Sequence, residues 1–286
     1  MSRRYCVVDV FTETPLKGNP LAVVVDGEGL SEAQMQAFAQ WTNLSETSFL
    51  LPPTDPAADY RVRIYTPARE LPFAGHPTLG SCQAWLNHGG QPRGEQVVQQ
   101  CAIGLVRVRR QEGRLAFAAP PLLRSGPLEA PVLAQICRAL KLGPEDIVAH
   151  QWVDNGPGWC AVMLRSAEQV LGLKPDFAAL QQLELGVVGP HQGLQKFGVV
   201  AVRDGEAQFE VRAFISTMGV PEDPVTGSLN AGLAQWLMAV GIAPERYVAA
   251  QGAALGRAGR VHVDRAGDTI WIGGAVQGLV QGSVTL

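Results

Sequence analysis

The sequence has few charged residues and no long apolar run. Charged residues make up 17% of the 286 residues, below the usual quarter, and the net charge is −3. This balance gives no broad basic surface, which argues against nucleic acid as a partner. No apolar run approaches the roughly 18 residues that a membrane span needs, and the first residues lack the apolar core of a signal peptide. We therefore expect a cytoplasmic protein without a membrane segment.

Cysteine is scarce, and several site motifs are missing. The five cysteines are odd in number and contain no CxxC pair, which predicts reduced thiols. There is no GxGxxG after a strand, no GxxxxGK[ST] and no GxSxG, and the histidines lack metal-site spacing. Cys82 lies on the apolar stripe of a predicted helix, so we expect a structural cysteine there and not a nucleophile.

Two similar stretches are present, at residues 63–86 and 212–237. Both open with Arg-x-aromatic, pass through a loop of Pro, Gly and Thr, and end in Gln-Ala-Trp-Leu or Ala-Gln-Trp-Leu. The spacing between them is about half the chain length. Each stretch predicts a strand, a glycine loop and a helix, whose first N–H groups could hold a carboxylate or phosphate. We therefore expect two related halves, each with a helix start suited to an anion.

The predicted elements indicate an α+β fold, because strands arrive in adjacent groups and do not alternate with helices. Residues 118–131 carry four prolines and are the expected linker. This predicts domains at 1–120 and 130–286, with the option that the last strand returns to the first domain. Three short strands are expected in 260–286, and another at 197–202.

Two helix starts carry capping signals. Ser31 and Gln34 have the spacing of a capping box, which predicts a helix directly after Ser31. Apolar residues recur at helical spacing after Ser228, which makes Ser228 the expected N-cap of that helix.

Three side chains are candidates for acid/base chemistry. Glu46 precedes an apolar run, where burial would disfavour the charged carboxylate and suit a general acid or base, although a turn glutamate is the plainer reading. His76 lies in the break before a helix, where a structural hydrogen-bonding role is the alternative. Asp223 lies in the matching loop of the second half and could be an ordinary loop aspartate. Together they suit proton transfer next to a carboxylate, without metal or organic cofactor.

At these residues the sequence resembles the PhzF-type isomerases of phenazine biosynthesis, in the diaminopimelate-epimerase-like superfamily. The matching pieces are VDVFTETPLKGNPLAVV (8–24), NLSETSF (43–49), RIYTPARELPFAGHPTLG (63–80), EDPVTGSLNAGL (222–233) and QGAALGRAGRVHV (251–263). The resemblance implies two pseudo-symmetric α+β domains, each a half-barrel of mixed strands around a central helix. It also implies an active site in the cleft between the domains, a homodimer and no cofactor.

The resemblance also implies roles for individual residues. Glu46 matches the family's catalytic acid/base, and His76 and Asp223 match its cleft partners. Gly75, Gly227 and Ser228 match the backbone positions that hold the substrate carboxylate.

The family's reaction is the isomerisation of 2,3-dihydro-3-hydroxyanthranilate, so we predict a cofactor-independent isomerase acting on a small anionic carboxylate. The related racemases use two opposed cysteines, and neither matching loop here contains one. An epimerase or tautomerase on another small carboxylate is the second hypothesis, and a binding or regulatory homologue without turnover is the third.

Overall fold

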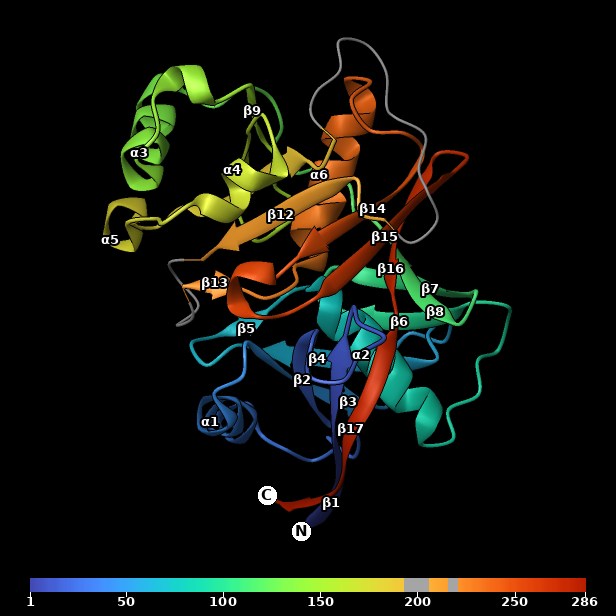
Figure 1. The fold of residues 1–286 in the computed structure, drawn as a ribbon. Helices are drawn as coiled ribbons and strands as arrows, with labels where there is room; N and C mark the ends of the chain where they lie inside the picture. Colours follow the sequence, from blue (N-terminus) through green and yellow to red (C-terminus); the bar gives the residue numbers. More distant parts are fainter. Residues whose placement is uncertain (193–205, 216–220) are drawn as a thin grey trace. The chain divides into compact units, whose positions relative to one another are not determined.

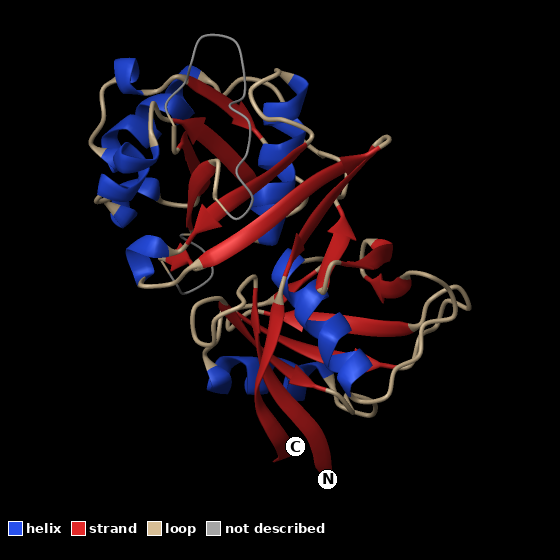
Figure 2. Ribbon diagram, turned by 45° about the vertical axis from the view of Figure 1, so that its right-hand side comes forward, coloured by secondary structure: helices blue, strands red, loops and turns tan. Residues whose placement is uncertain are grey.

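The computed structural model describes residues 1–192, 206–215 and 221–286. The chain forms two compact units (Figure 1). Unit 1 contains Met1–Ala118 and Gly273–Leu286, and unit 2 contains Ala119–Ile272. The strand predicted at 197–202 lies outside the described residues. Figure 2 shows that strands dominate the described chain and that the helices are few, so the predicted α+β class is confirmed.

Unit 1 is built on a mixed sheet whose first strand pairs with its last. Its elements are β1 (Ser2–Val10), β2 (Asn19–Val24), α1 (Glu32–Thr42), β3 (Glu46–Leu51), β4 (Tyr60–Tyr65), β5 (Glu70–Leu71), α2 (Gly75–Asn87), β6 (Val97–Cys101), β7 (Gly104–Gln111), β8 (Arg114–Ala118) and β17 (Val276–Thr285). β1 pairs antiparallel with both β17 and β2. β2 and β3 are parallel, as are β4 and β6, whereas β3–β4, β6–β7 and β7–β8 are antiparallel.

The helix α2 is the centre of unit 1. It contacts β1, β2, β3, β6, β8 and β17, so the sheet wraps around it. Its first eight residues are all buried, which is expected of a helix enclosed by a sheet and not lying on its surface. Gly80 allows this close approach, because a Cβ there would lie 2.5 Å from Leu21 Cδ2. The predicted half-barrel around a central helix therefore describes unit 1.

Unit 2 repeats the order of strands and central helix, with an additional helix before its first strand and two helices in the place of α1. Its elements are α3 (Ala130–Leu140), β9 (Ala149–Trp152), β10 (Trp159–Met163), α4 (Ala167–Gly172), α5 (Phe177–Leu180), β11 (Glu184–Pro190), β12 (Phe209–Phe214), β13 (Glu222–Asp223), α6 (Gly227–Ala239), β14 (Arg246–Gln251) and β15 (Gly259–Ala266), with 3-10 turns at Pro144–Asp146 and Ala253–Leu255. β16 (Thr269–Gly274) follows, so the predicted three strands of 260–286 are present.

The pairing directions of unit 2 match those of unit 1. β9–β10, β11–β12 and β14–β15 are antiparallel, whereas β10–β11 and β12–β14 are parallel. Both units attach a two-residue strand, β5 or β13, just before the central helix. α2 and α6 each contain 13 residues. The two stretches recognised in the sequence are therefore equivalent parts of two similar units.

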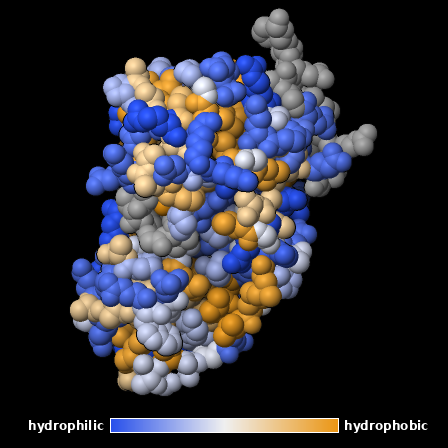
Figure 3. All heavy atoms as spheres, turned by 60° about the vertical axis from the view of Figure 1, so that its left-hand side comes forward, coloured by the Kyte–Doolittle hydropathy of each residue, from blue (hydrophilic) through white to orange (hydrophobic). Residues whose placement is uncertain are grey.

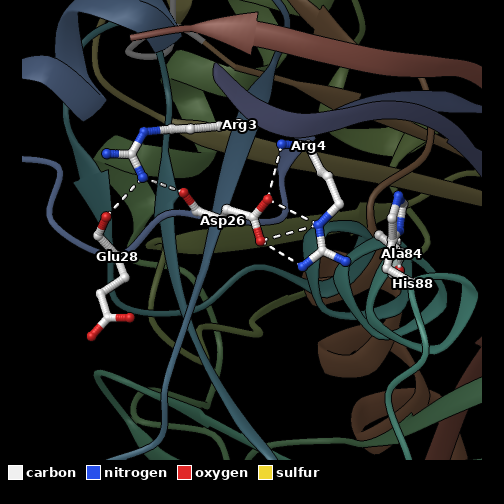
Figure 4. A network of polar contacts seen from close by, with 6 residues as sticks. All are labelled: Arg3, Arg4, Asp26, Glu28, Ala84 and His88. Atoms are coloured by element: carbon white, nitrogen blue, oxygen red, sulfur yellow. Dashed lines mark hydrogen bonds and ion pairs between the residues drawn. The ribbon is translucent and has the colours of Figure 1, made fainter. Parts of the chain in front are cut away.

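An ion pair fixes the register at the outer end of β1. Arg4 on β1 contacts the Asp26 carboxylate through Nε and Nη2, and its backbone N–H also donates to that carboxylate (Figure 4). Arg3 donates to the carbonyls of Asp26 and Glu28. The hydrogen bonds from Arg4 lower the pKa of Asp26 to about 2, so the pair persists at neutral pH.

The surface has scattered apolar side chains. Leu16, Trp41 and Leu123 are each at least 70% exposed. Figure 3 shows one face, on which apolar side chains appear in several separate patches among hydrophilic ones. Single exposed apolar residues are normal in globular proteins. Among the described residues, no helix is both long and apolar enough to cross a membrane.

Candidate active site

Glu46 is placed by the end of α1. The predicted capping box is confirmed, since Ser31 Oγ accepts from Gln34 N and the Gln34 side chain accepts from Ser31 N. The helix ends at Asn43, whose φ of 53° is the left-handed conformation that asparagine tolerates. The chain then turns, and Glu46 begins β3 opposite Leu21 of β2. Glu46 is 7% exposed, which makes it a buried carboxyl at the start of a central strand.

His76 is the second residue of α2. The helix begins at Gly75 after Ala74, and no side chain caps it. Pro77 is the third residue, where its missing N–H costs nothing because first-turn N–H groups have no partner within the helix. The His76 imidazole is 2% exposed. Sheet and helix thus bring a carboxyl and an imidazole together inside unit 1.

The two side chains meet directly. His76 Nε2 lies 3.5 Å from Glu46 Oε2, and His76 Nδ1 lies 3.2 Å from the side-chain amide nitrogen of Asn19. In the neutral tautomer protonated at Nε2, Nδ1 accepts from the amide, and the Nε2 proton faces the carboxyl without making a hydrogen bond. Burial lowers the pKa of His76 to about 3, opposed by a hydrogen bond to the Pro20 backbone. Near pH 7 the contact therefore joins a carboxyl to a neutral imidazole, and it is not an ion pair.

The loop between β1 and β2 supports this pair. Asn19 is fully buried at the start of β2. The loop is held by Asp9, which is 1% exposed and accepts a hydrogen bond from Gly18 N at 3.1 Å. A Cβ on Gly18 would lie 2.3 Å from Val10 O, so only glycine fits this turn. No sequence pattern indicated a role for Asn19 or Asp9, although both fall in the first matching piece, 8–24.

Asp223 lies just before the central helix of unit 2, α6. It ends β13 and is 5% exposed. Its Oδ2 accepts a hydrogen bond from Thr226 Oγ1 at 2.5 Å. Gln251 on β14 joins the same network: its Oε1 accepts from Thr226 N and from Asn230, and its Nε2 donates to Asp223 O. The side chain of Gln251 thus holds the start of α6, a role that no motif in the sequence indicated.

The predicted N-cap of α6 is wrong. The helix begins at Gly227 with Thr226 as its N-cap residue, so Ser228 is already the second helical residue. Ser228 Oγ accepts a hydrogen bond from Trp159 Nε1 at 3.0 Å, and Asn155 donates to its carbonyl. The capping rule failed because the serine hydroxyl finds a tertiary partner. As in α2, no side chain caps the helix, so the first N–H groups of Gly227 and Ser228 are not occupied by a cap.

No thiol lies at either helix start, where the sequence reads Ala74-Gly75-His76 and Thr226-Gly227-Ser228. All five cysteines are unbridged. Burial raises the pKa of Cys82 to about 12, so this thiol stays protonated and unreactive, as expected. Among the residues that the structure describes, no group of three or more His, Cys, Asp or Glu is arranged to hold a metal ion.

The chemistry available in unit 1 is proton transfer. A buried carboxyl next to a neutral imidazole can accept a proton in one step and return it in the next. The uncapped start of α2 adds backbone N–H groups and the positive end of the helix dipole, which attract a carboxylate. Unit 2 offers a second uncapped helix start, beside the Asp223 carboxyl.

Solved structures of known proteins share this fold. A crystal structure of a phenazine biosynthesis protein of the PhzF family from Enterococcus faecalis has a TM-score of 0.78 and 29% identity, with 100% of both chains covered. A solved structure of a probable proline racemase from Agrobacterium radiobacter, at 13% identity, shares the fold alone. The predicted diaminopimelate-epimerase-like fold is confirmed.

Sequence comparison identifies the family of this chain. The model of the family described as phenazine biosynthesis-like protein matches residues 8–275, so this chain belongs to that family. It is 33% identical over 238 residues to a trans-2,3-dihydro-3-hydroxyanthranilate isomerase of Pseudomonas fluorescens, covering 80% of this chain and 78% of that protein. It is 36% identical over 232 residues to antisense-enhancing sequence 1 of Schizosaccharomyces pombe, covering 77% and 75%. The predicted class of enzyme, a PhzF-like isomerase, is confirmed.

Proposed function

We propose that this protein is an isomerase that moves a proton on a small carboxylate substrate by general acid/base catalysis. The reaction would be similar to that named for the relative from Pseudomonas fluorescens, trans-2,3-dihydro-3-hydroxyanthranilate isomerisation. The observation that carries the proposal is the buried contact of 3.5 Å between Glu46 and His76 at the start of α2. A carboxyl held in this way can exchange a proton with carbon in a site that excludes bulk water.

In this mechanism Glu46 is the acid/base. Its carboxylate removes a proton from a substrate carbon, the electron pair moves into the conjugated system, and the protonated Glu46, whose acid proton can exchange with solvent, returns a proton to another carbon of that system. His76 remains neutral, and its proposed role is to orient the Glu46 carboxyl, which lies 3.5 Å from it. The reaction balances without oxidant, metal or organic cofactor, because only a proton and a double bond change place.

The substrate carboxylate is proposed to bind to backbone N–H groups at Gly75, Gly227 and Ser228, with Asp223 as a further polar partner. What supports this assignment is that both helices begin without a side-chain cap. A carboxylate at such a helix start is stabilised by the first N–H groups and by the helix dipole. The participation of Asp223, like the predicted cleft, stays a proposal that the family resemblance supports.

The remaining parts of the proposal are a homodimer, which rests on the family resemblance, and a cytoplasmic location, which rests on the unbridged cysteines. Light scattering on the purified chain checks the dimer, since a dimer has twice the 30.5 kDa mass of one chain. A mass of 30.5 kDa across a wide range of protein concentration would contradict it.

Deuterium exchange tests the enzyme. The protein is incubated in deuterated water with 2,3-dihydro-3-hydroxyanthranilate and with other small carboxylates, and carbon-bound deuterium is measured by NMR. Glu46→Gln should reduce exchange by at least about 100-fold, because removing a positioned acid/base typically costs 10²- to 10⁴-fold. Glu95→Gln is the matched control, since Glu95 is exposed in the loop after α2 and should leave the rate unchanged.

The outcomes separate the candidate functions. Exchange with the dihydro-hydroxyanthranilate and formation of its isomer support the proposal. Exchange only with another carboxylate supports an epimerase or tautomerase acting at the same residues. One relative is named for antisense enhancement and not as an isomerase, so a binding or regulatory role is the third candidate. No exchange with any carboxylate would favour that role, and full activity of Glu46→Gln would exclude Glu46 as the acid/base.

A further inference from the structure

Unit 2 contains a cavity that the proposed reaction does not use. It measures about 660 Å³, within the range of small-molecule sites. Among the residues that line it are His191, Glu210, Ala250, Arg257 and Arg260. Glu210 is the unusual residue among them, because it carries an ionisable carboxyl and yet is only 2% exposed.

Register explains how the cavity forms. Glu210 on β12 is directly opposite Ala250 on β14, and Ala250 is directly opposite Arg260 on β15. Directly opposed residues share one face of a sheet, so the three form a row. The small side chain of Ala250 leaves a hollow between the two long ones. The backbones of Glu210 and Arg260 are two inter-strand spacings apart, about 10 Å.

Glu210 has one oxygen to offer a ligand. Its Oε2 lies 3.2 Å from His191 Nε2, whereas its Oε1 is buried and has no hydrogen-bond partner among the described residues. Burial raises the pKa of Glu210 to about 7 and lowers the pKa of His191, so the pair holds one proton between its two facing atoms near neutral pH. Whichever partner carries that proton, Oε1 remains an acceptor. A ligand must therefore bring a donor, such as an ammonium group.

Arg260, in contrast, offers hydrogen-bond donors and a positive charge to a ligand. Its guanidinium donates to the carbonyl of the neighbouring Gly259 and has no ion-pair partner among the described residues. It is close enough to lower the pKa of Glu210 electrostatically. A guanidinium at the rim of a hollow prefers a carboxylate, which it can bind in a bidentate way.

We propose that this cavity binds a small α-amino acid, with its ammonium group on Glu210 Oε1 and its carboxylate on Arg260. An unsatisfied buried acceptor and an unpaired guanidinium, separated by the methyl group of Ala250, fit the two charged ends of one zwitterion. The site belongs entirely to unit 2 and shares no residue with the proposed acid/base pair in unit 1.

Ligand-observed NMR on the full-length protein tests the site. The probes are L-alanine, L-glutamate and L-phenylalanine, with acetate and ethylamine as ligands that keep only one of the two charged groups. At least one amino acid should bind saturably and about 10-fold more tightly than either single-group probe. No saturable binding of any of the three, or equal affinity for acetate or ethylamine, would overturn the proposal.

Substitutions place the binding in this cavity. Arg260→Gln and Glu210→Gln should each weaken amino-acid binding by about 10-fold or more. Arg246→Gln, an exposed arginine of the same unit, should leave it unchanged. Arg260 is on the surface, so Arg260→Gln keeps the test decisive if Glu210→Gln does not fold. Glu46→Gln should bind as the unmodified protein does, whether or not the isomerase proposal holds. Loss of binding in Glu46→Gln, with none in Arg260→Gln, would place the ligand elsewhere and refute the proposal.

Discussion

At the scale of single residues, the central feature is a histidine that cannot act as a proton carrier at neutral pH. The ring of His76 is enclosed by the sheet of unit 1, and burial disfavours its charged form. In the neutral imidazole, Nε2 lies 3.5 Å from the Glu46 carboxyl without making a hydrogen bond to it. In the proposed mechanism the two side chains therefore have different roles, with Glu46 moving the proton and His76 orienting the Glu46 carboxyl.

We predict that His76 does not titrate between pH 5 and 8. Its folded pKa of about 3 lies below the ordinary histidine value of about 6.5, so the unfolded chain binds the extra proton first. The contribution of the neutral His76 to the free energy of unfolding is fully present above about pH 6.5 and is lost as the pH drops toward 3. At pH 4.5 the loss is roughly 3 kcal/mol. A flat pH profile of the His76 Cε1 proton in NMR checks the prediction, and His76→Gln should lack this acid-dependent loss in urea unfolding. A midpoint near pH 6.5 for His76 would refute it.

Part of this site could be proposed from the sequence. A carboxyl before an apolar run and a histidine at a helix start made Glu46 and His76 candidates, and the family resemblance favoured them over turn and structural roles. Asn19 was not a candidate, because its residue type is common in turns and its contact with His76 spans 57 residues of sequence. The wrong N-cap has the same origin: a local rule assigned Ser228, and a tertiary hydrogen bond from Trp159 decided its role.

At the scale of elements, the internal repeat extends beyond what the sequence displays. Arg63 pairs with Glu70, and Arg212 pairs with Glu222, each through two hydrogen bonds. The strand registers make the two pairs equivalent, since Tyr65 faces Glu70 and Phe214 faces Glu222. The arginines were visible as an offset in the sequence. Their partners were not, because the spacing to the glutamate differs between the halves.

The same registers make Glu184 the counterpart of Glu46. Each begins a strand of the parallel pair, and each is buried. Glu46 lies opposite Leu21, whereas Glu184 lies opposite Trp159, whose indole binds Ser228 at the position equivalent to His76. The scaffold is thus repeated, and the side chains at the helix start differ. This difference gives the two units different chemical capabilities.

The two Arg–Glu ion pairs should contribute unequally to stability. The Arg212–Glu222 side chains are 6% exposed, and those of Arg63 and Glu70 are 26% and 32% exposed. Glu222→Ala leaves a buried, unpaired guanidinium and should cost about 3–5 kcal/mol. Glu70→Ala should cost about 1 kcal/mol or less, because water can solvate Arg63. Urea unfolding of the two variants measures this difference. Equal losses in the free energy of unfolding would show that burial does not determine how much each ion pair contributes.

At the scale of the whole molecule, unit 1 is assembled from both ends of the chain. β1 and β17 pair along their full length, and the amino group of Met1 donates to the carbonyl of Leu286. Figure 1 shows the two termini side by side. The sequence predicted both strands from their composition. It left their pairing as one option, because an alternating pattern specifies which face of a strand is buried and not which distant strand lies beside it.

Removing β17 should therefore damage unit 1 selectively. A chain truncated after Ala275 leaves one edge of β1 without its partner and removes Val284 and Leu286, which pack on the core around Phe38 and Phe49. The residues of unit 2 are all retained. Limited proteolysis with mass spectrometry should show cleavage throughout residues 1–118 and protection of a fragment that begins near Ala119. Proton exchange on substrate should be lost as well, because Glu46 and His76 belong to unit 1. Removal of Leu286 alone is the control and should change the digestion pattern little. Equal protection of residues 1–118 in the truncated and complete chains would mean that β17 is dispensable for the fold of unit 1.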